Sequence, residues 1–112
     1  MDSVPRSDLD TAVEQLWVRF LPVILERVSA LESAAAALAA DELTREQLGA
    51  AQAAAHKLAG TLGTFNLQRG TDVARHLEQL CASANRPDGP FAARFSSLTA
   101  ELRSLIENRS AR

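Results

Sequence analysis

The stretch AHKLAGTLGTF, residues 55–65, decides the fold and shows where to look for chemistry. Its leucines and its phenylalanine recur three and four positions apart, which predicts an amphipathic helix. His56 is followed four and seven residues later by Gly60 and Gly63. Glycine inside a helix costs roughly 1 kcal/mol relative to alanine. Two glycines at these positions therefore indicate that something approaches the helix closely beside the histidine.

A helical wheel separates the two faces of this helix. At about 100° per residue, with Leu58 at zero, the apolar residues cluster near about 30°, whereas His56 falls near about 160°. The inward set comprises Leu48, Ala51, Ala55, Leu58, Leu62 and Phe65. The outward sector around His56 holds Gly49, Ala53, Gly60 and Gly63, with Gln52 at its edge. Such a thinly covered strip with one projecting imidazole is typical of a docking surface. A plainer interpretation stays open, in which an alanine-rich helix has an incidental surface histidine.

The apolar residues elsewhere keep the same spacing, which predicts helices on both sides of this segment. They are expected over residues 8–20, 22–39, 44–65, 68–84 and 91–108. Pro22 has no backbone N–H, so it either kinks one long helix or begins the second helix in its first turn. Because the connections are short, neighbouring helices should run antiparallel. The expected fold is all-α: an antiparallel four-helix up-down bundle with a short extra N-terminal helix.

Several signals define the ends of these helices. Thr44 and Gln47 have the spacing of a capping box, which begins the third helix. Asn66 tolerates the left-handed conformation that ends helices. The clearest loop is the stretch RPDGP at residues 86–90. The apolar positions of the first helix are Leu9, Val13, Leu16, Trp17 and Phe20.

Composition and charge exclude several classes of function. The 112 residues have a net charge of -2, without the basic stripe of a nucleic-acid-binding protein. No apolar stretch reaches the ~18 residues of a membrane span, and the first residues lack a signal-peptide pattern. With one cysteine, Cys81, expected in the core, the sequence favours a cytoplasmic protein, and we expect a monomer. We expect one domain over residues 1–112, with flexible ends at 1–7 and 109–112.

His56 lacks the neighbours that most histidine chemistry requires. The sequence holds no HExxH motif and no cluster of cysteines and histidines, which argues against a metal site. It has no GxxxxGK[ST] phosphate loop and no activated nucleophile near His56. What remains is the imidazole itself as a nucleophile. A neutral ring with its proton on Nδ1 leaves Nε2 free to accept a phosphoryl group.

Such a ring needs an acceptor for the Nδ1 proton. Glu78 is the best candidate, because it lies beside Leu77 at the edge of the apolar face of the next, antiparallel helix. Gln52, one turn before His56, is a weaker candidate. The alternative, in which Glu78 is an ordinary boundary carboxylate, is equally open. His76 is expected to be a structural or surface residue.

These residues resemble the signature of histidine-containing phosphotransfer (HPt) domains. The resemblance rests on His56, Lys57, Leu58, Ala59 and Gly60, then on Gly63, Phe65 and Leu67, and later on Ala74, Leu77 and Glu78. It implies that His56 accepts a phosphoryl group on Nε2 and exchanges it with an aspartate of a response-regulator receiver domain. The family position twenty-two residues after the histidine often holds Gln or Glu bonded to Nδ1, and here it is Glu78.

The resemblance also implies partners and limits. The partners would be a receiver domain and a sensor histidine kinase. The domain would be a phosphoryl carrier rather than an enzyme, with no cofactor of its own and with Mg²⁺ supplied by the receiver. The expected docking residues are Gln52, Ala53, Lys57, Ala59, Gly60 and Gly63.

Two departures from the family pattern leave alternatives open. Ala59 stands where a basic residue is frequent, and Asn66 stands where many members have glycine. One alternative is the phospho-accepting module of a larger, chemotaxis-type kinase. The other is a degenerate bundle that binds a receiver without being phosphorylated, which the missing basic residue at Ala59 supports.

Overall fold

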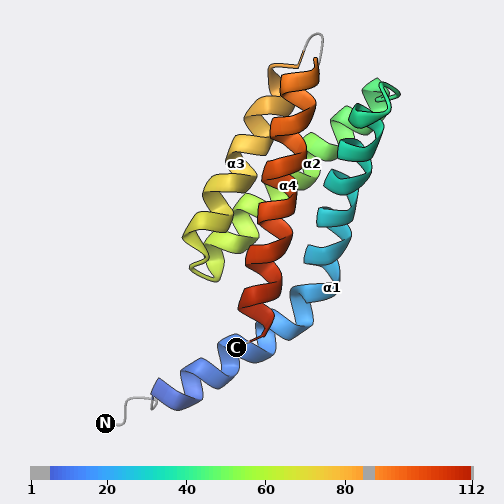
Figure 1. Ribbon diagram of the computed structural model, residues 1–112. Helices are drawn as coiled ribbons and strands as arrows, with labels where there is room; N and C mark the ends of the chain where they lie inside the picture. Colours follow the sequence, from blue (N-terminus) through green and yellow to red (C-terminus); the bar gives the residue numbers. More distant parts are fainter. Residues whose placement is uncertain (1–5, 85–87, 112) are drawn as a thin grey trace.

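Four helices pack side by side as an antiparallel up-down bundle (Figure 1). The computed structural model describes residues 6–84 and 88–111, with the side chains of residues 6 and 7 left aside. The helices are α1 (Arg6–Ala39), α2 (Arg45–Thr64), α3 (Gln68–Ala82) and α4 (Gly89–Ser110). Helix α1 packs against α2 and α4, and α3 packs against the same two helices from the other side. Within the described ranges no helix is long and apolar enough to cross a membrane. The expected all-α bundle is confirmed.

The short extra N-terminal helix is wrong as a separate element. Residues 8–20 form the first part of α1, which continues through Pro22. The helix bends in the light-blue part that contains Pro22 (Figure 1), as expected where a residue removes one backbone hydrogen bond. Core side chains lie on both sides of the bend, because Trp17 and Ile24 are both buried. This packing keeps the helix continuous in spite of the proline.

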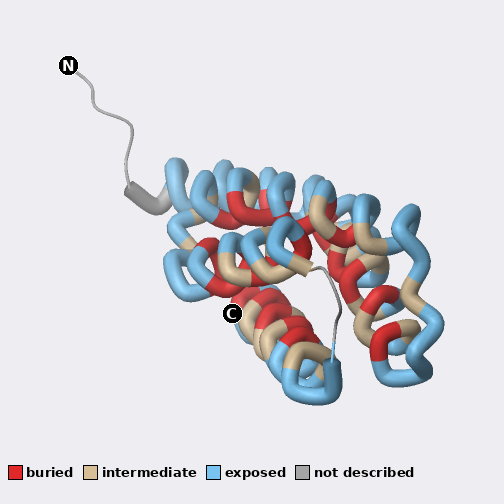
Figure 2. Tube along the Cα trace, turned by 90° about the horizontal axis from the view of Figure 1, so that it is seen from above, coloured by how far each residue is buried: buried red, intermediate tan, exposed pale blue. Residues whose placement is uncertain are grey.

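The N-terminal part of α1 extends past the rest of the bundle (Figure 1). Helix α1 has 34 residues and α2 has 20, so at about 1.5 Å per residue they are about 51 Å and about 30 Å long. Every residue from 8 to 16 is exposed. The buried positions lie farther along, where they face inward between the helices (Figure 2).

The C-terminal end of α4 holds this extension in place. Arg109 donates to Glu14 at 2.9 Å, and its guanidinium lies 4.9 Å from the centre of the Trp17 ring. The Trp17 indole N–H donates to the Ser110 hydroxyl at 3.0 Å. Flexibility was expected from residue 109 onward, but Arg109 and Ser110 lie within α4 and make these contacts. Among the remaining end residues, 1–5 and 112 lie outside the described part of the chain.

The helix ends follow the sequence signals. The backbone N–H of Thr44 donates to the Gln47 side chain at 3.0 Å, and the Gln47 N–H donates to Thr44 Oγ1 at 3.0 Å, so the capping box is confirmed. Asn66 has φ of 58°, the left-handed conformation expected after α2. Of the expected loop at 86–90, Asp88 caps α4 by accepting the Phe91 N–H at 2.9 Å. Residues 85–87 lie outside the described ranges.

Candidate functional site

The buried stripe of α2 fixes which way His56 points. The stripe comprises Ala51, Ala54, Ala55, Leu58, Ala59 and Leu62. With these side chains packed inward, the His56 side chain projects outward and is 74% exposed. The outward direction predicted by the helical wheel is confirmed.

The structure brings Glu78 of α3 to His56. Leu77 is fully buried, and this anchors α3 so that Glu78 lies at the edge facing α2. The distance between His56 Nδ1 and Glu78 Oε2 is 2.8 Å. An ionised carboxylate only accepts hydrogen bonds, so a neutral ring in this contact has its proton on Nδ1. The lone pair of Nε2 then stays free on the exposed side of the ring.

A shallow hollow of about 320 Å³ lies beside the ring. It is lined by Gly49, Gln52, Ala53, His56, Lys57 and Glu78. A groove of about 330 Å³ between α1 and α2 shares Ala53 and Lys57 with it, so the two form one surface next to the imidazole. Alanine and glycine dominate this surface on α2, which leaves His56 accessible to a broad partner. The structure thus places Gln52, Ala53 and Lys57 where the sequence analysis expected docking residues.

Comparisons with known proteins agree with this geometry. The family model described as Hpt domain matches residues 15–111. This chain belongs to the Hpt domain family. Members are phosphoryl carriers of two-component phosphorelays, where they work with kinases and receiver domains.

This Hpt domain is also similar to one curated protein of much greater length. It is 32% identical over 96 residues to protein RcaC of Microchaete diplosiphon. The match covers 86% of this chain and 15% of RcaC. No solved structure matches the chain significantly.

The two glycines after the histidine differ in their surroundings. At Gly60 an added Cβ would meet nothing within 4 Å, so the space above it is open to a partner. At Gly63 an added Cβ would lie 3.7 Å from Thr71 Oγ1, on the side where α3 packs. Gly60 therefore leaves room for docking, whereas Gly63 borders the contact between α2 and α3.

Ala59 was expected among the docking residues of this Hpt domain, but its side chain is buried. The residue is only 6% exposed. It lies about 100° from Leu58 on the wheel, on the same side of α2 as Gly63, where α3 covers the helix. The position three residues after His56 thus has a buried methyl group in place of the basic residue that the family resemblance led us to expect.

The other histidine has a different kind of neighbour. Arg94 of α4 approaches His76 Nε2 with its guanidinium at 3.0 Å. A guanidinium only donates, so Nε2 of His76 accepts this bond. Arg94 was not predicted as a neighbour of His76 from the sequence, because the register of α4 against α3 depends on tertiary packing.

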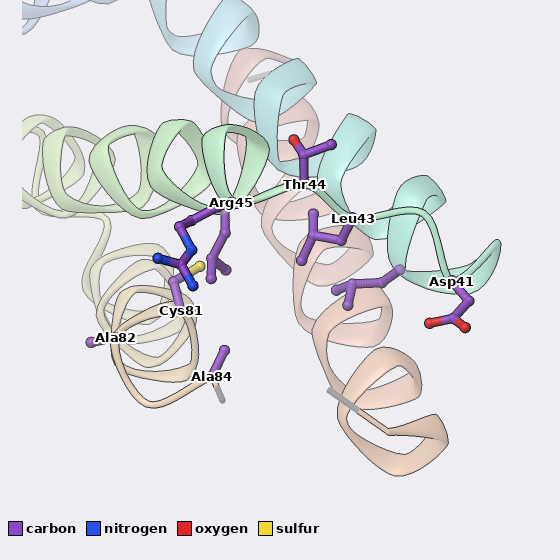
Figure 3. A pocket seen from close by; sticks show the side chains of 9 residues that line it. Asp41, Leu43, Thr44, Arg45, Cys81, Ala82 and Ala84 are labelled. Atoms are coloured by element: carbon purple, nitrogen blue, oxygen red, sulfur yellow. The ribbon is translucent and has the colours of Figure 1, made fainter. Parts of the chain in front are cut away.

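A larger hollow lies at the end of the bundle where α1 connects to α2 (Figure 3). Its volume is about 490 Å³, and it is lined by Leu38, Asp41, Leu43, Thr44, Arg45, Leu48, Cys81, Ala82 and Ala84. Burial, assisted by the negative charge of Glu78, raises the pKa of the Cys81 thiol to about 11. A thiol that stays protonated at neutral pH is a poor nucleophile, which agrees with the expected core role of Cys81.

Proposed function

We propose that His56 accepts a phosphoryl group on Nε2 and exchanges it with an aspartate of a response-regulator receiver domain. The observation that supports this most strongly is the contact of 2.8 Å between Nδ1 and Glu78 beneath a ring that is 74% exposed. It combines a fixed tautomer with an accessible lone pair. Membership of the Hpt family supports the same reaction class.

No proton has to leave the histidine during the transfer. The Nε2 lone pair attacks the phosphorus of the receiver's aspartyl phosphate, and a new N–P bond forms. The P–O bond to the aspartate breaks, and the carboxylate leaves with its electron pair. The ring keeps its proton on Nδ1 and becomes positively charged, and the Glu78 carboxylate offsets that charge at 2.8 Å. The reverse step returns the phosphoryl group to an aspartate.

The receiver would supply most of the charge that the phosphoryl group needs. Phosphoryl transfer depends on alignment and on neutralising the transferred oxygens. Lys57 is exposed and lines the hollow beside His56, but Ala59 places no cation on the α3 side. We therefore assign Mg²⁺ and the main cationic groups to the receiver, and no cofactor to this chain. Gln52, Ala53, Lys57 and Gly60 would form the surface on which the receiver docks.

The test is phosphoryl transfer from a receiver charged with a small phospho-donor. Intact-mass measurement should show one added phosphoryl group that is labile in acid and stable in base. His56→Gln should abolish it, while His76→Gln, which changes the chain's other histidine, should leave it intact. Acid-labile phosphate that persists in His56→Gln, or that depends on His76, would contradict the proposal.

A second candidate is receiver binding without phosphorylation. The buried Ala59 favours it, because the cation that many relatives place near the phosphoryl group is missing. The same assay separates the two candidates. A receiver that binds tightly to the unmodified chain but never labels His56 would support the second.

A further inference from the structure

The extension of α1 has an apolar stripe that no described helix covers. We define the outer stripe as Leu9, Val13, Leu16 and Phe20, which are between 42% and 53% exposed. Their spacing is four, three and four residues, the spacing by which two helices pack along each other. The buried positions of α1 begin at Trp17 and continue at Ile24 and Val28. On a helical wheel the outer stripe and the buried positions point within about 40° of each other, so the outer stripe continues the core-facing side of α1 past the end of the bundle.

The outer stripe lies partly beyond the family's common region. Leu9 and Val13 precede the match to the Hpt family model, which begins at residue 15. At the other end, Phe20 meets the end of α2 through an edge contact with Phe65, at 6.2 Å between ring centres. None of the four residues lines the hollow beside His56. Contiguous exposed apolar side chains mark interaction surfaces, so this stripe indicates an interface separate from the histidine site.

We propose that a second copy of this chain covers the outer stripe, with the two α1 extensions packed antiparallel. Under a two-fold axis, one register pairs all four residues at once. Leu9 of one copy then lies opposite Phe20 of the other, and Val13 lies opposite Leu16. The stripe is thus complementary to itself, which is what a two-fold dimer interface requires. This proposal differs from the monomer expected from the sequence, and it rests on the exposure of these four side chains.

The charges beside the stripe favour the same arrangement. Asp8 and Arg19 lie on the same side of the outer stripe, each about 100° from its centre. In the antiparallel register, Arg19 of one copy lies within about 3 Å along the axis of Asp8 of the other. The symmetry forms this pair of opposite charges twice. A parallel two-fold pair would place this flank of one copy on the opposite side of the interface from the same flank of the other copy, so it would form neither pair.

The first test is the mass of the full chain in solution over a wide range of protein concentration. Sedimentation should show a monomer–dimer equilibrium. Leu16→Glu should raise the dissociation constant at least about tenfold, because it buries two charges in the apolar contact. Val18→Glu is the matched control: Val18 is 67% exposed on the opposite face of the same helix, and its variant should dimerise as the original chain does. Circular dichroism checks that both variants keep their helices.

The outcomes decide the proposal. It is overturned if the original chain is monomeric at every concentration, or if Val18→Glu weakens the dimer as much as Leu16→Glu does. It is also overturned if Leu16→Glu removes receiver binding and leaves self-association unchanged. Because the interface leaves His56 open, dimer-deficient Leu16→Glu should still be phosphorylated, so this test stands apart from that of the proposed function.

A charge swap tests the antiparallel register. Asp8→Arg and Arg19→Asp should each weaken the dimer several-fold, because each creates two like-charge contacts. The double variant should recover most of the loss, since it restores opposite charges with their places exchanged. A double variant no better than the worse single variant would contradict the antiparallel arrangement.

Discussion

The two histidines of this chain differ in the helix that faces them. His56 on α2 has a carboxylate oxygen of Glu78 at 2.8 Å from Nδ1, and His76 on α3 has the guanidinium of Arg94 at 3.0 Å from Nε2. The carboxylate accepts a hydrogen bond from a ring nitrogen that has a proton, whereas the guanidinium donates a hydrogen bond to a ring nitrogen that has none. In neutral form both rings therefore have their proton on Nδ1. Only His56 keeps the Nε2 lone pair free.

The comparison shows that the neighbour decides whether a histidine can be a nucleophile. An imidazole on a helix surface has the same intrinsic chemistry wherever it lies. An acceptor behind Nδ1 directs the lone pair outward, and a donor on Nε2 occupies it. The contrast between Glu78 and Arg94 is thus the reason for proposing His56, and not His76, as the nucleophile. Variants of these two neighbours test that proposal directly.

Removal of the acceptor should have the largest effect. Glu78→Ala should slow phosphoryl transfer to His56 by about 10–100-fold, the usual consequence of losing a residue that orients a reactive imidazole. Glu78→Gln should slow the transfer much less, because its amide oxygen can still accept the hydrogen bond from the Nδ1–H of His56. Rapid-quench measurement with one charged receiver gives both rates. Equal rates for Glu78→Ala and the original chain would remove the basis of the comparison.

Removal of the donor should leave transfer unchanged and expose His76. In Arg94→Ala, the rate of transfer to His56 should stay within about twofold of the original rate. Arg94 contacts His76 and not His56, and the loss of such a surface contact changes the stability of the fold little. A change of the transfer rate comparable to that of Glu78→Ala would mean that the two neighbours do not differ as described.

Docking beside His56 should respond to the open space at Gly60. Gly60→Arg should weaken receiver binding by about tenfold, because a long side chain enters a surface that accepts a partner closely. Gly89→Arg is the matched control, since an added Cβ there also meets nothing within 4 Å and the residue lies at the start of α4, outside the lining of the hollow beside His56. Calorimetric titration with a receiver measures both affinities. The same weakening in both variants would indicate a general charge effect in place of close approach.

The rates of chemical modification of His56 and His76 should also differ, by less than the rates of phosphoryl transfer do. Diethyl pyrocarbonate reacts with an imidazole nitrogen that has a free lone pair, so His56 should react several-fold faster than His76. Arg94→Ala should narrow that difference, because it frees Nε2 of His76. Peptide mapping after timed exposure gives the two rates. A faster His76 in the original chain would reverse the proposed order.

The smallest effect concerns a pair that only holds helices together. Arg103 of α4 bonds Glu32 of α1, at 2.9 Å for one of its two contacts, and this hydrogen bond lowers the pKa of the Glu32 carboxyl. A lowered pKa in the folded chain stabilises it above the ordinary value of 4.5, and this contribution is lost as the pH falls through the folded value.

Glu32→Gln should therefore lower the free energy of unfolding at pH 7 by at most about 1 kcal/mol, since the pair is partly exposed. The difference from the original chain should shrink at acid pH. Phosphoryl transfer to His56 should be unaffected. Urea unfolding at the two pH values measures this. If the loss of unfolding free energy in Glu32→Gln grew as the pH fell, the Glu32 carboxyl would not have the lowered pKa described above.

The sequence predicts those parts of the molecule that depend on local spacing. Periodicity and the Thr44 capping box are enough for the helices and for the outward direction of His56. Glu78 was found because antiparallel neighbours bring a boundary residue of the next helix to the same level. Each of these steps uses one helix or two adjacent ones.

Features that depend on more distant packing were missed. The continuity of α1 through Pro22 requires Trp17 and Ile24 to be buried on both sides of the bend. The order at Arg109 comes from contacts with Glu14 and Trp17, more than ninety residues earlier in the sequence. Ala59 was expected among the docking residues from the resemblance to the family, which does not show which neighbour covers each face of a helix.

The most direct test of the account observes the nitrogens of His56 themselves. Long-range proton–nitrogen correlation spectra of a chain labelled with ¹⁵N in histidine report which nitrogen has the proton. Before phosphorylation, the account predicts a His56 ring protonated on Nδ1. After transfer from a charged receiver, it predicts phosphorus coupled to Nε2 with the proton still on Nδ1. A His56 ring protonated on Nε2 before transfer, or phosphorus on Nδ1 or on His76 after it, would contradict the central claim.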